Sequence, residues 1–489
     1  TAKRRRYGLI KFLLTQKMCQ VSDRSPNTTV LNFLRQEEAK KGTKEGCASG
    51  DCGACTVVLG DVVDGRIRYT SVNACITFLS ALHGKQLITV EDLKAKDGTL
   101  HQVQQALVDN NGTQCGYCTP GFVMSMFALS KNTPSADKQV IFEALAGNLC
   151  RCTGYRSIID SAMSLAEQPH VVDAFERLEA ETVAKLNTIE RNGTQTLSGN
   201  GQTAYSPDNV AELAALLVKH PDARIVAGGT DLALEITQFH RPINTLISVG
   251  NVAEMKDITV TDCHIEIGAA RSLTDSYSTL ARYFPDFAEL LHRFASLQVR
   301  NQGTIGGNIG NASPIGDTPP ALIALNAQVE LRCGDDVRLM DLDDYFVGYK
   351  ITAQQAAEFI TKIIIPLPTP EQVFRTYKLS KRLDDDISAV LGAFNITLKD
   401  NVVTDIRIAF GGMAATPMRA QHAEKILLGA TWEYHNVAAA MQALAKDFSP
   451  LSDFRASKEY RSLTAKNLLK KFYLELQNTT IETRVTSYV

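Results

Sequence analysis

Cysteine is the residue that most constrains what this chain can fold into. Eleven cysteines occur in 489 residues, and eight of them fall into two tight sets. The first set is Cys47, Cys52, Cys55 and Cys75, and the second is Cys115, Cys118, Cys150 and Cys152. Disulfide frameworks are typical of small secreted domains, and this chain is long, has an odd number of cysteines and shows no secretion signal. We therefore expect both sets to bind metal, and Cys19, Cys263 and Cys333 to be buried or inert thiols.

The first set has the spacing C-x4-C-x2-C with a fourth cysteine downstream, which is typical of plant-type [2Fe–2S] sites. Four small residues stand among these cysteines: Gly46, Gly50, Gly53 and Ala54. They allow the backbone to wrap closely round a cluster and to point N–H groups at its sulfurs, which raises its potential. A structural zinc loop favours two C-x2-C pairs, whereas the first pair here is spaced by four. The spacing therefore favours iron and sulfide over zinc.

The second set pairs C-x2-C with C-x-C. Cys115 and Cys118 precede a predicted helix at Thr119-Pro120, and Cys150 and Cys152 follow the stop signal of another helix at Gly147. The partial positive charge of a helix N-terminus favours thiolates and an anionic cluster. By spacing alone zinc remains an alternative, but the position directly after a ferredoxin-like loop favours a second [2Fe–2S] cluster. Two clusters in series indicate a one-electron relay.

Composition and charge narrow the function further. Hydrophobic residues make up 44% and charged residues 21%, and 51 basic residues face 53 acidic ones. This excludes a mainly disordered or coiled-coil chain, and the missing basic excess argues against binding to nucleic acid. No apolar run approaches the ~20 residues of a membrane span. We interpret the basic residues 3–6 as an exposed tip before a first strand, rather than a signal peptide, because Lys11 interrupts the apolar run and no cleavage site follows. We expect a cytoplasmic protein.

Local signals indicate the main elements. Residues 56–59 and 67–70 flank Asp64-Gly65, a strong hairpin signal. A short helix over 30–37 follows Thr28-Thr29, residues suited to a cap. Further helices are predicted over 101–109, from Thr119 through 129, over 135–146 and from about Ser157, with two more near 436–447 and 464–477. Between 205 and 370 strands alternate with helices.

Two glycine-rich runs suggest a nucleotide cofactor. Residues 225–232, IVAGGTDL, are an apolar strand that enters a Gly-Gly turn, where backbone N–H groups can approach a pyrophosphate. Residues 300–311, RNQGTIGGNIGN, form a second run, and Asp317 shortly after could accept hydrogen bonds from ribose hydroxyls. Taken alone, the first run is better explained as a strand-ending turn, and Asp317 as an ordinary turn or cap residue.

Together these motifs resemble the molybdenum hydroxylases, the family that includes xanthine dehydrogenase and aldehyde oxidase. The resemblance rests on the first cysteine set, on the runs CGYCTPG and GNLCRCTGY, and on the glycine-rich runs. It implies a multidomain α+β fold. We expect a β-grasp [2Fe–2S] ferredoxin domain over 1–90, a four-helix [2Fe–2S] domain over 91–168, a linker over 169–200, an α+β FAD-binding domain over 201–370 and a C-terminal α+β flavoprotein domain over 371–489.

The resemblance also implies individual contacts. It places the eight cysteines as cluster ligands and the FAD pyrophosphate on Ile225, Val226, Ala227, Gly228, Gly229, Thr230, Asp231 and Leu232. Further FAD contacts are implied at Phe294, Gly306, Gly307, Asn308, Asp317, Ile360 and Lys378, with Phe294 against the isoalloxazine ring. Arg382 and Asp385 are candidates for shaping the approach of NAD.

The combination of both clusters with FAD in a chain of this length is similar to the small subunits of bacterial xanthine dehydrogenases. We expect electrons from purine hydroxylation, at a molybdopterin centre on a large partner chain, to pass through both clusters to FAD and then to NAD. No residue of this chain is expected to catalyse the hydroxylation itself. A heterotetramer of two small and two large chains is the expected assembly. The alternatives are a sibling enzyme that acts on an aldehyde or another N-heterocycle, and a zinc-containing interaction protein.

Overall fold

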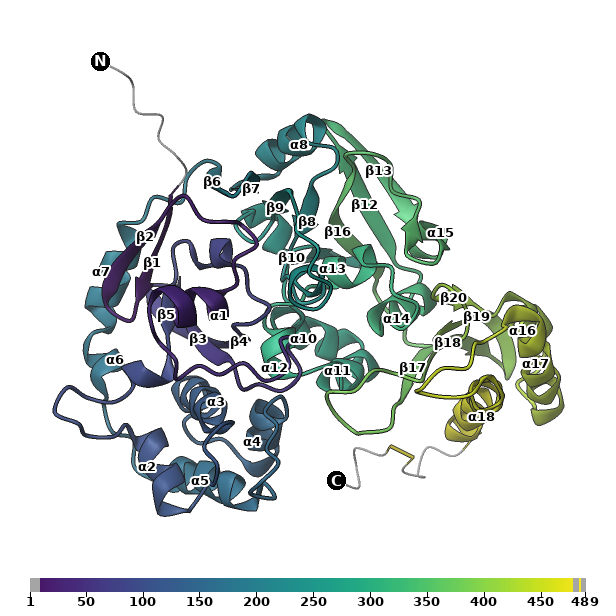
Figure 1. The fold of residues 1–489 in the computed structure, drawn as a ribbon. Coiled ribbons are helices and arrows are strands. Elements are labelled where there is room, and N and C mark those ends of the chain that lie inside the picture. The colour runs from purple at the N-terminus through teal and green to yellow at the C-terminus, as the bar shows by residue number, and fades with distance from the viewer. Residues whose placement is uncertain (1–8, 478–482, 485–489) are drawn as a thin grey trace. The chain divides into compact units, whose positions relative to one another are not determined.

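The computed structural model describes residues 9–477 together with 483 and 484, so the basic tip over residues 3–6 lies outside the described part. Its contacts divide the chain into two units (Figure 1). The first unit contains the chain up to Glu254 with residues 272–274 and 295–304. The second contains residues 255–271, 275–294 and the chain from Ile305. This division falls inside the predicted FAD-binding domain, 201–370.

A five-stranded mixed sheet begins the first unit, in the order β2-β1-β5-β3-β4. The strands are β1 (Ile10–Leu14), β2 (Lys17–Val21), β3 (Thr56–Val63), β4 (Arg66–Asn73) and β5 (Gln86–Ile88). The predicted hairpin is confirmed, because β3 and β4 pair from Thr56–Asn73 to Val63–Arg66. Asp64 and Gly65 in its turn both have positive φ, 49° and 77°, as a type I′ turn requires. The predicted helix over 30–37 is α1 (Val30–Asn32) continued by a π-helical turn, Phe33–Glu37.

Four helices follow, as the sequence predicts. They are α2 (Gln102–Asp109), α3 (Thr119–Asn132), α4 (Lys138–Leu145) and α5 (Arg156–Glu167). Helix α3 begins at Thr119, as predicted, with Cys118 as its N-cap and Pro120 in the first turn. The buried side of α3 (Phe122, Met126 and Phe127) shares one core with Val58 of β3. The helices are therefore packed directly on the first sheet.

The segment 169–200, which the sequence presents as a linker, contains regular structure. It forms α6 (Ala174–Arg177), α7 (Glu179–Asn187) and the strand β6 (Gln195–Gly199). Phe175, Leu186 and Ile189 are buried in the core that α3 shares with the first sheet. The mixed charge of the segment reflects the exposed sides of two amphipathic helices.

The rest of the first unit is a smaller sheet in the order β6-β7-β9-β8, with β7–β9 and β8–β9 parallel. Its further elements are β7 (Gln202–Ser206), α8 (Val210–Lys219), β8 (Arg224–Val226), α9 (Leu234–Thr237), β9 (Thr245–Ser248) and α12 (Leu297–Arg300). Parallel strands need crossover connections, which α8 and α9 supply.

The second unit contains two larger sheets. The first has the order β10-β11-β16-β12-β13 and the second the order β17-β18-β19-β20. The strands of the first sheet are β10 (Ile258–Val260), β11 (His264–Gly268), β12 (Gln328–Cys333), β13 (Asp336–Asp341) and β16 (Phe359–Pro366). The helices of this part of the chain are α10 (Leu273–Tyr283), α11 (Pro285–His292), α13 (Ile305–Gly310), α14 (Thr318–Ala324) and α15 (Leu342–Tyr345). A small separate hairpin consists of β14 (Phe346–Gly348) and β15 (Ile351–Thr352).

Three helices accompany the C-terminal sheet in this part of the chain. Its elements are β17 (Gln372–Leu379), β18 (Val390–Lys399), β19 (Val402–Gly411), β20 (Met418–Arg419), α16 (Gln421–Leu427), α17 (Tyr434–Asp447) and α18 (Lys458–Gln477). Phe472 of α18 is fully buried and stacks on Phe394 of β18 at 5.1 Å between ring centres. Trp432 packs edge-on against the ring of Phe472 at 5.8 Å between ring centres, so Phe472 is the centre of an aromatic core.

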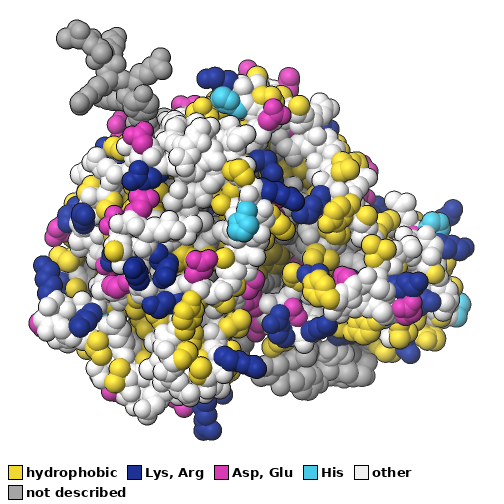
Figure 2. All heavy atoms as spheres, viewed as in Figure 1, with side chains coloured by type: hydrophobic (Ala, Val, Ile, Leu, Met, Phe, Trp, Pro, Cys, Tyr) yellow, Lys and Arg dark blue, Asp and Glu magenta, His cyan; other side chains and the backbone are white. Residues whose placement is uncertain are grey.

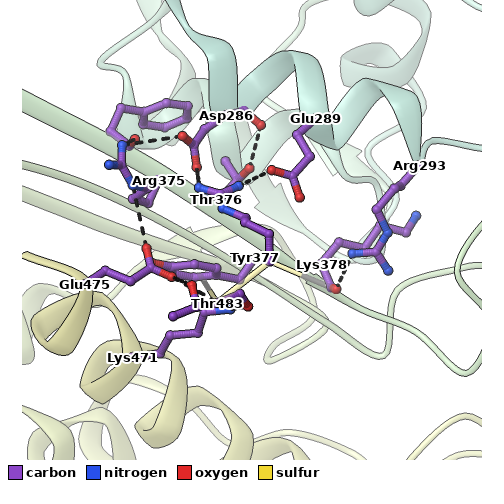
Figure 3. A network of polar contacts seen from close by, with 12 residues as sticks. Asp286, Glu289, Arg293, Arg375, Thr376, Tyr377, Lys378, Lys471, Glu475 and Thr483 are labelled. Carbon is purple, nitrogen blue, oxygen red and sulfur yellow. Dashed lines mark hydrogen bonds and ion pairs between the residues drawn. The ribbon is translucent and has the colours of Figure 1, made fainter. Parts of the chain in front are cut away.

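A polar network ties α11, β17 and α18 together (Figure 3). Asp286 of α11 accepts from the N–H of Thr376 at 3.1 Å and lies 3.4 Å from a nitrogen of Arg375. Tyr377 donates to Glu475 of α18 at 2.7 Å. Burial raises the pKa of the Asp286 carboxyl despite its cationic neighbours, and burial also raises the pKa of Tyr377. Helix α11, strand β17 and helix α18 are thus joined by largely buried hydrogen bonds and ion pairs.

The surface view in Figure 2 shows Lys and Arg side chains interspersed with Asp and Glu on the face drawn. This mixing agrees with the nearly balanced count of charges. Within the residues that the structure describes, no helix combines the length and the apolar character needed to cross a membrane.

The aromatic core predicts that Phe472→Ala destabilises the C-terminal sheet. Removal of a fully buried Phe costs about 3–5 kcal/mol. Phe454→Ala is the matched control, because that ring is 80% exposed and its loss should cost less than about 1 kcal/mol. Thermal unfolding of the two variants, followed by differential scanning calorimetry, measures the difference. Equal melting temperatures of the two variants would show that the buried ring of Phe472 contributes no more to stability than the exposed ring of Phe454.

Candidate functional site

The first cysteine set surrounds a tight loop before β3. Cys47 Sγ accepts three backbone hydrogen bonds, from the N–H groups of Ser49 at 3.4 Å, Asp51 at 3.3 Å and Cys52 at 3.4 Å. The loop achieves this with positive φ at Ala48 (55°) and Gly50 (85°). N–H groups directed at a cysteine sulfur are what a negatively charged cluster requires.

The structure brings the four sulfurs of this set together. The Cys47 thiol is within hydrogen-bonding distance of Cys52 and Cys75, and Cys75 in turn of Cys55. Hydrogen bonds from Cys52 and Cys75 lower the pKa of Cys47, and the same bonds raise the pKa of the two donors. Cys55 and Cys75 are each 2% exposed. The four sulfurs therefore lie close enough together to bind one metal cluster, which would deprotonate the thiols.

The second set converges in the same way. Cys150 and Cys152 lie in the loop between α4 and α5. Cys118 at the start of α3 lies beside Cys150, and Cys115 lies beside Cys152. Burial raises the pKa of Cys118 to about 12. Burial acts on Cys150 as well, but hydrogen bonds from the hydroxyl and N–H of Thr153 outweigh it and lower the pKa of that thiol.

Both groups fit a [2Fe–2S] cluster, which takes two thiolates on each of two irons. In the described residues, no three His, Cys, Asp or Glu side chains are placed about a single metal ion. The close sulfur contacts link all four cysteines of the first set and form two pairs in the second. We propose all eight predicted cysteines as the cluster ligands.

The two cysteine loops touch each other through the backbone. The carbonyl of Cys52 accepts from the N–H of Leu149, the residue before Cys150, at 2.9 Å. Asn148 donates to the carbonyl of Gly53 at 3.1 Å. A Cβ at Gly53 would lie 2.2 Å from the carbonyl oxygen of Gly147, so no other residue fits there without moving backbone.

A buried amide network surrounds this contact, and the sequence analysis did not include it. Gln298 of α12 donates to Asn148 at 3.0 Å and to Ser125 of α3 at 3.1 Å. Ser125 also donates to Asn148 at 2.6 Å. Gln298 and Asn148 are at most 2% exposed. The hydrogen-bond partners of Gln298 and Asn148 are distant in sequence. The only local signal for this network is the dipeptide Gly147-Asn148 shortly before Cys150.

The predicted flavin contacts are divided between the two units. Residues 225–232 belong to the first unit, where they form the end of β8 and the loop before α9. Gly229 has a φ of 76°, and a Cβ on Gly228 would lie 2.0 Å from the carbonyl oxygen of Gln302. The glycine pair thus allows the two glycine-rich runs to meet backbone to backbone.

The remaining predicted contacts belong to the second unit. Gly306 and Gly307 lie in α13, and a Cβ on Gly306 would lie 2.5 Å from the carbonyl oxygen of Ala269. Asn308 in the same helix accepts from the hydroxyl of Thr318 at 2.6 Å, and Ile360 lies on β16, 3.8 Å from the Cβ position of Gly310. Phe294 follows α11 and is half-buried.

Asp317 and Lys378 form a buried ion pair. Lys378 Nζ lies 2.6 Å from Asp317, and both side chains are almost fully buried. Ser388 donates to the other carboxylate oxygen at 2.6 Å, so each oxygen of Asp317 already has a partner in the protein. The pair joins two predicted FAD contacts that are far apart in sequence. Any hydroxyl of a bound nucleotide would have to use the remaining lone pairs of this carboxylate.

The loop after β17 contains the two residues predicted to shape NAD access. Arg382 pairs with Asp386 at 3.1 Å and is largely exposed, and Asp385 has a positive φ of 48°. Arg293, which the sequence analysis did not identify, holds this loop. Its guanidinium donates to the carbonyls of Lys378 at 2.8 Å and Leu383 at 3.1 Å (Figure 3 shows the first). Burial lowers the pKa of Arg293.

The three cysteines outside the two sets differ from one another. Cys19 is buried, as expected, and Cys333 is half-buried. Cys263 is exposed and hydrogen-bonded to a histidine, so it is not a buried thiol, and whether it is inert stays a prediction. It lies in a turn, where no apolar neighbours cover it.

Four family models match the chain in succession. They are a 2Fe–2S iron–sulfur cluster binding domain over 14–80, a [2Fe–2S] binding domain over 89–163, an FAD binding domain in molybdopterin dehydrogenase over 198–368 and a CO dehydrogenase flavoprotein C-terminal domain over 375–476. The chain belongs to the molybdenum hydroxylase family. Its multidomain α+β fold, with two iron–sulfur domains and two flavoprotein domains, is confirmed.

Individual molybdenum hydroxylases resemble the chain over most of its length. Xanthine dehydrogenase of Emericella nidulans is 33% identical over 90% of this chain and 36% of its own length. Xanthine dehydrogenase 1 of Arabidopsis thaliana is 31% identical over 91% of this chain and 38% of its own. The chain therefore spans less than half the length of these relatives.

Solved structures of the family match part of the chain. A carbon monoxide dehydrogenase from Hydrogenophaga pseudoflava shares 29% identity and a TM-score of 0.52, over 55% of this chain and 94% of that one. A quinoline 2-oxidoreductase from Pseudomonas putida 86 shares 25% identity and a TM-score of 0.50, with the same coverage of both chains.

The cysteine geometry predicts that Cys75→Ser removes the first cluster selectively. A serine hydroxyl is a poor replacement for a thiolate on iron, so we expect the variant to lose about half of its iron and acid-labile sulfide. Cys333→Ser is the matched control and should keep both. Colorimetric iron and sulfide assays with electron paramagnetic resonance of the reduced protein measure the result. Full iron content in Cys75→Ser would remove Cys75 from the ligands.

The buried ion pair predicts that Lys378→Met is strongly destabilising. Removal of one partner leaves an uncompensated buried carboxylate at a cost of about 3–5 kcal/mol. We expect a lower melting temperature and reduced flavin content in this variant. The double variant Lys378→Met, Asp317→Asn should recover part of the stability because it removes the unpaired charge. Calorimetry and flavin absorbance of the parent and both variants test this, and an unchanged single variant would contradict it.

Proposed function

We propose that this chain is the electron-transfer portion of a xanthine dehydrogenase, and that it passes electrons singly through two [2Fe–2S] clusters to FAD. The observation that carries the proposal is the direct contact between the two cysteine loops, Cys52 carbonyl to Leu149 N–H at 2.9 Å. The relatives named xanthine dehydrogenase, which match along nearly the whole chain, support the choice of enzyme. A single cluster could serve a structural purpose, whereas two clusters with touching loops favour a relay.

The oxidation of purine would take place at a molybdopterin centre outside this chain, on a large partner. When bound, the two clusters exchange single electrons, and FAD collects the pair that NAD takes as hydride. The protein's part is to fix positions and to tune potentials. We therefore assign no general acid, base or nucleophile of this chain to the hydroxylation. A heterotetramer of two small and two large chains remains the proposed assembly.

The residues at the two ends of the relay perform different tasks. At the first cluster, N–H groups directed at Cys47 stabilise negative charge on sulfur and raise the potential of the cluster. Between the clusters, Asn148 and Gln298 hold the loops together through direct hydrogen bonds. At the flavin, the Lys378–Asp317 pair fixes β17 against α14, and Arg293 fixes the loop of Arg382 and Asp385. We propose that this loop sets the width of the nicotinamide entrance.

A second candidate is a molybdenum hydroxylase with another substrate, an aldehyde or a different N-heterocycle. The structural similarity to carbon monoxide dehydrogenase and to quinoline 2-oxidoreductase favours keeping it open. The flavin and iron–sulfur portion does not touch substrate in this proposal, so its residues do not choose between the two. The choice belongs to the partner chain.

Purification of the native assembly separates the candidates. Mass spectrometry of the companion polypeptide should identify a molybdopterin-binding chain. Anaerobic addition of xanthine should then bleach the flavin and iron–sulfur absorbance, whereas quinoline, an aldehyde or carbon monoxide should not. Bleaching by one of the latter alone would favour the second candidate. A colourless protein that contains zinc but no iron or flavin would exclude both candidate functions.

The relay predicts that Cys150→Ser interrupts electron flow within an otherwise intact protein. The variant should keep FAD, because Cys150 lies in the loop between α4 and α5, whereas the predicted FAD contacts lie at residues 225–232 and from Phe294 onward. Xanthine-dependent formation of NADH should fall by at least about a hundredfold, since loss of a cluster ligand removes the intermediate carrier. Bleaching of the flavin by NADH added directly should persist. Undiminished xanthine turnover would contradict the relay.

A further inference from the structure

A row of polar side chains runs from the β10–β11 turn along β11, outside the cluster and flavin sites. Cys263 Sγ in the turn lies 3.1 Å from Nδ1 of His264. Nε2 of His264 lies 2.9 Å from one oxygen of Glu266, and the other oxygen accepts from Lys362 of β16 at 2.8 Å. A thiol joined to an imidazole that is itself oriented by a carboxylate is the arrangement that activates cysteine nucleophiles.

The turn holds the sulfur in a fixed position. The hydroxyl of Thr261 accepts from the N–H of His264 at 3.1 Å and from the N–H of Cys263 at 3.4 Å. The N–H of Thr261 donates to the carbonyl of His264 at 2.9 Å, and Leu367 donates to the carbonyl of Cys263 at 2.9 Å. Backbone on both sides of the cysteine is therefore bonded, while its side chain is exposed.

The charges round the sulfur favour its anionic form. On β11 and β16 the facing groups are His264, Glu266 and Lys362, and Glu330 of β12 lies 3.3 Å from Lys362. Asp262 in the turn opposes the effect. Hydrogen bonds from His264 and Thr261 nevertheless lower the pKa of Cys263, and Glu266 raises the pKa of His264. Both shifts bring the pair closer to its thiolate–imidazolium form.

We propose that Cys263 is a site of reversible covalent modification by low-molecular-weight disulfides, with His264 and Glu266 as the residues that position and activate its thiolate. The Cys263 thiolate attacks one sulfur of the disulfide, a new S–S bond forms, and the old S–S bond breaks. Cys263 is oxidised, and the departing sulfur leaves as a thiolate that takes a proton from the His264 imidazolium or from water. A second thiol reverses the step by the same exchange.

The other cysteine of this sheet cannot be the exchange partner. Cys333 ends β12, where its neighbour Arg332 is paired with Phe359 of β16, whereas His264 is paired with Pro366. Phe359 and Pro366 are seven residues apart, or about 23 Å along a strand at ~3.3 Å per residue. A disulfide needs Cα atoms within about 7 Å. Cys333 is therefore excluded as the partner of Cys263, and we take the second sulfur from a small-molecule disulfide.

The test is the rate at which oxidised glutathione modifies each cysteine of the holoprotein, measured by mass spectrometry of alkylated peptides from pH 5 to pH 9. Each unit by which a thiol pKa falls gains about tenfold in thiolate at low pH and loses about threefold in nucleophilicity. We therefore expect Cys263 to react faster than Cys333 at pH 6, by about threefold for each unit by which its pKa is the lower. The pH midpoint for Cys263 should lie below that of an ordinary thiol, ~8.5.

Two variants test the roles of the neighbours. His264→Gln should move the pH midpoint of Cys263 up towards that of an ordinary thiol and remove its advantage over Cys333, and Glu266→Gln should move it part of the way. His435→Gln is the matched control, because His435 lies beside Glu433 at 3.4 Å in the same kind of pair but is located on α17. Should His264→Gln fail to fold, the pH profile of the parent protein decides alone. Equal rates and midpoints for Cys263 and Cys333, or a midpoint unmoved by His264→Gln, would overturn the proposal.

Discussion

The structure depends on one close backbone contact between two loops that are about a hundred residues apart in sequence. At Gly53 the carbonyl oxygen of Gly147 comes so near that a Cβ would lie 2.2 Å away, and at Gly121 a Cβ would lie 2.1 Å from the oxygen of Gly53. Glycine is required at such positions because any side chain would force the loops apart. Since each loop carries a cysteine set, this spacing also sets how near two redox centres can be.

Polar side chains secure this contact where apolar packing could not. Asn148 and Gln298 satisfy carbonyl and hydroxyl groups that the approach of the two loops has removed from water. A buried polar network of this kind fixes one geometry, because each lost bond leaves an unpaired polar group. The second unit uses a similar device at Lys378 and Asp317, where a buried ion pair joins β17 to the start of α14. Both networks give rigidity at places where cofactors are proposed to bind.

The sequence predicted the features that depend on local chemistry. The hairpin at Asp64-Gly65, the four helices after residue 100 and the convergence of each cysteine set follow from turn residues, caps and spacing. The contacts of Asn148 with Gly53 and of Gln298 with Asn148 span 95 and 150 residues, so no local signal reports them. The segment 169–200 misled because its charged surface hides Phe175, Leu186 and Ile189, which fill the core. The flavin and NAD contacts remain predictions, since they depend on resemblance rather than on local pattern.

The order in which the chain is synthesised affects when the first sheet and the first cysteine loop can be completed. Strand β1 pairs with the central strand β5, whose partner residues Gln86 and Leu87 are made more than seventy residues later, and the carbonyl of Cys52 is covered only when Leu149 arrives. Contacts of such long range form slowly. The nascent chain therefore presents Cys47 and Cys52 uncovered before the helices close over them. During that interval the sulfurs are open to solvent and to oxidants, so the topology of the chain limits when a cluster could be enclosed.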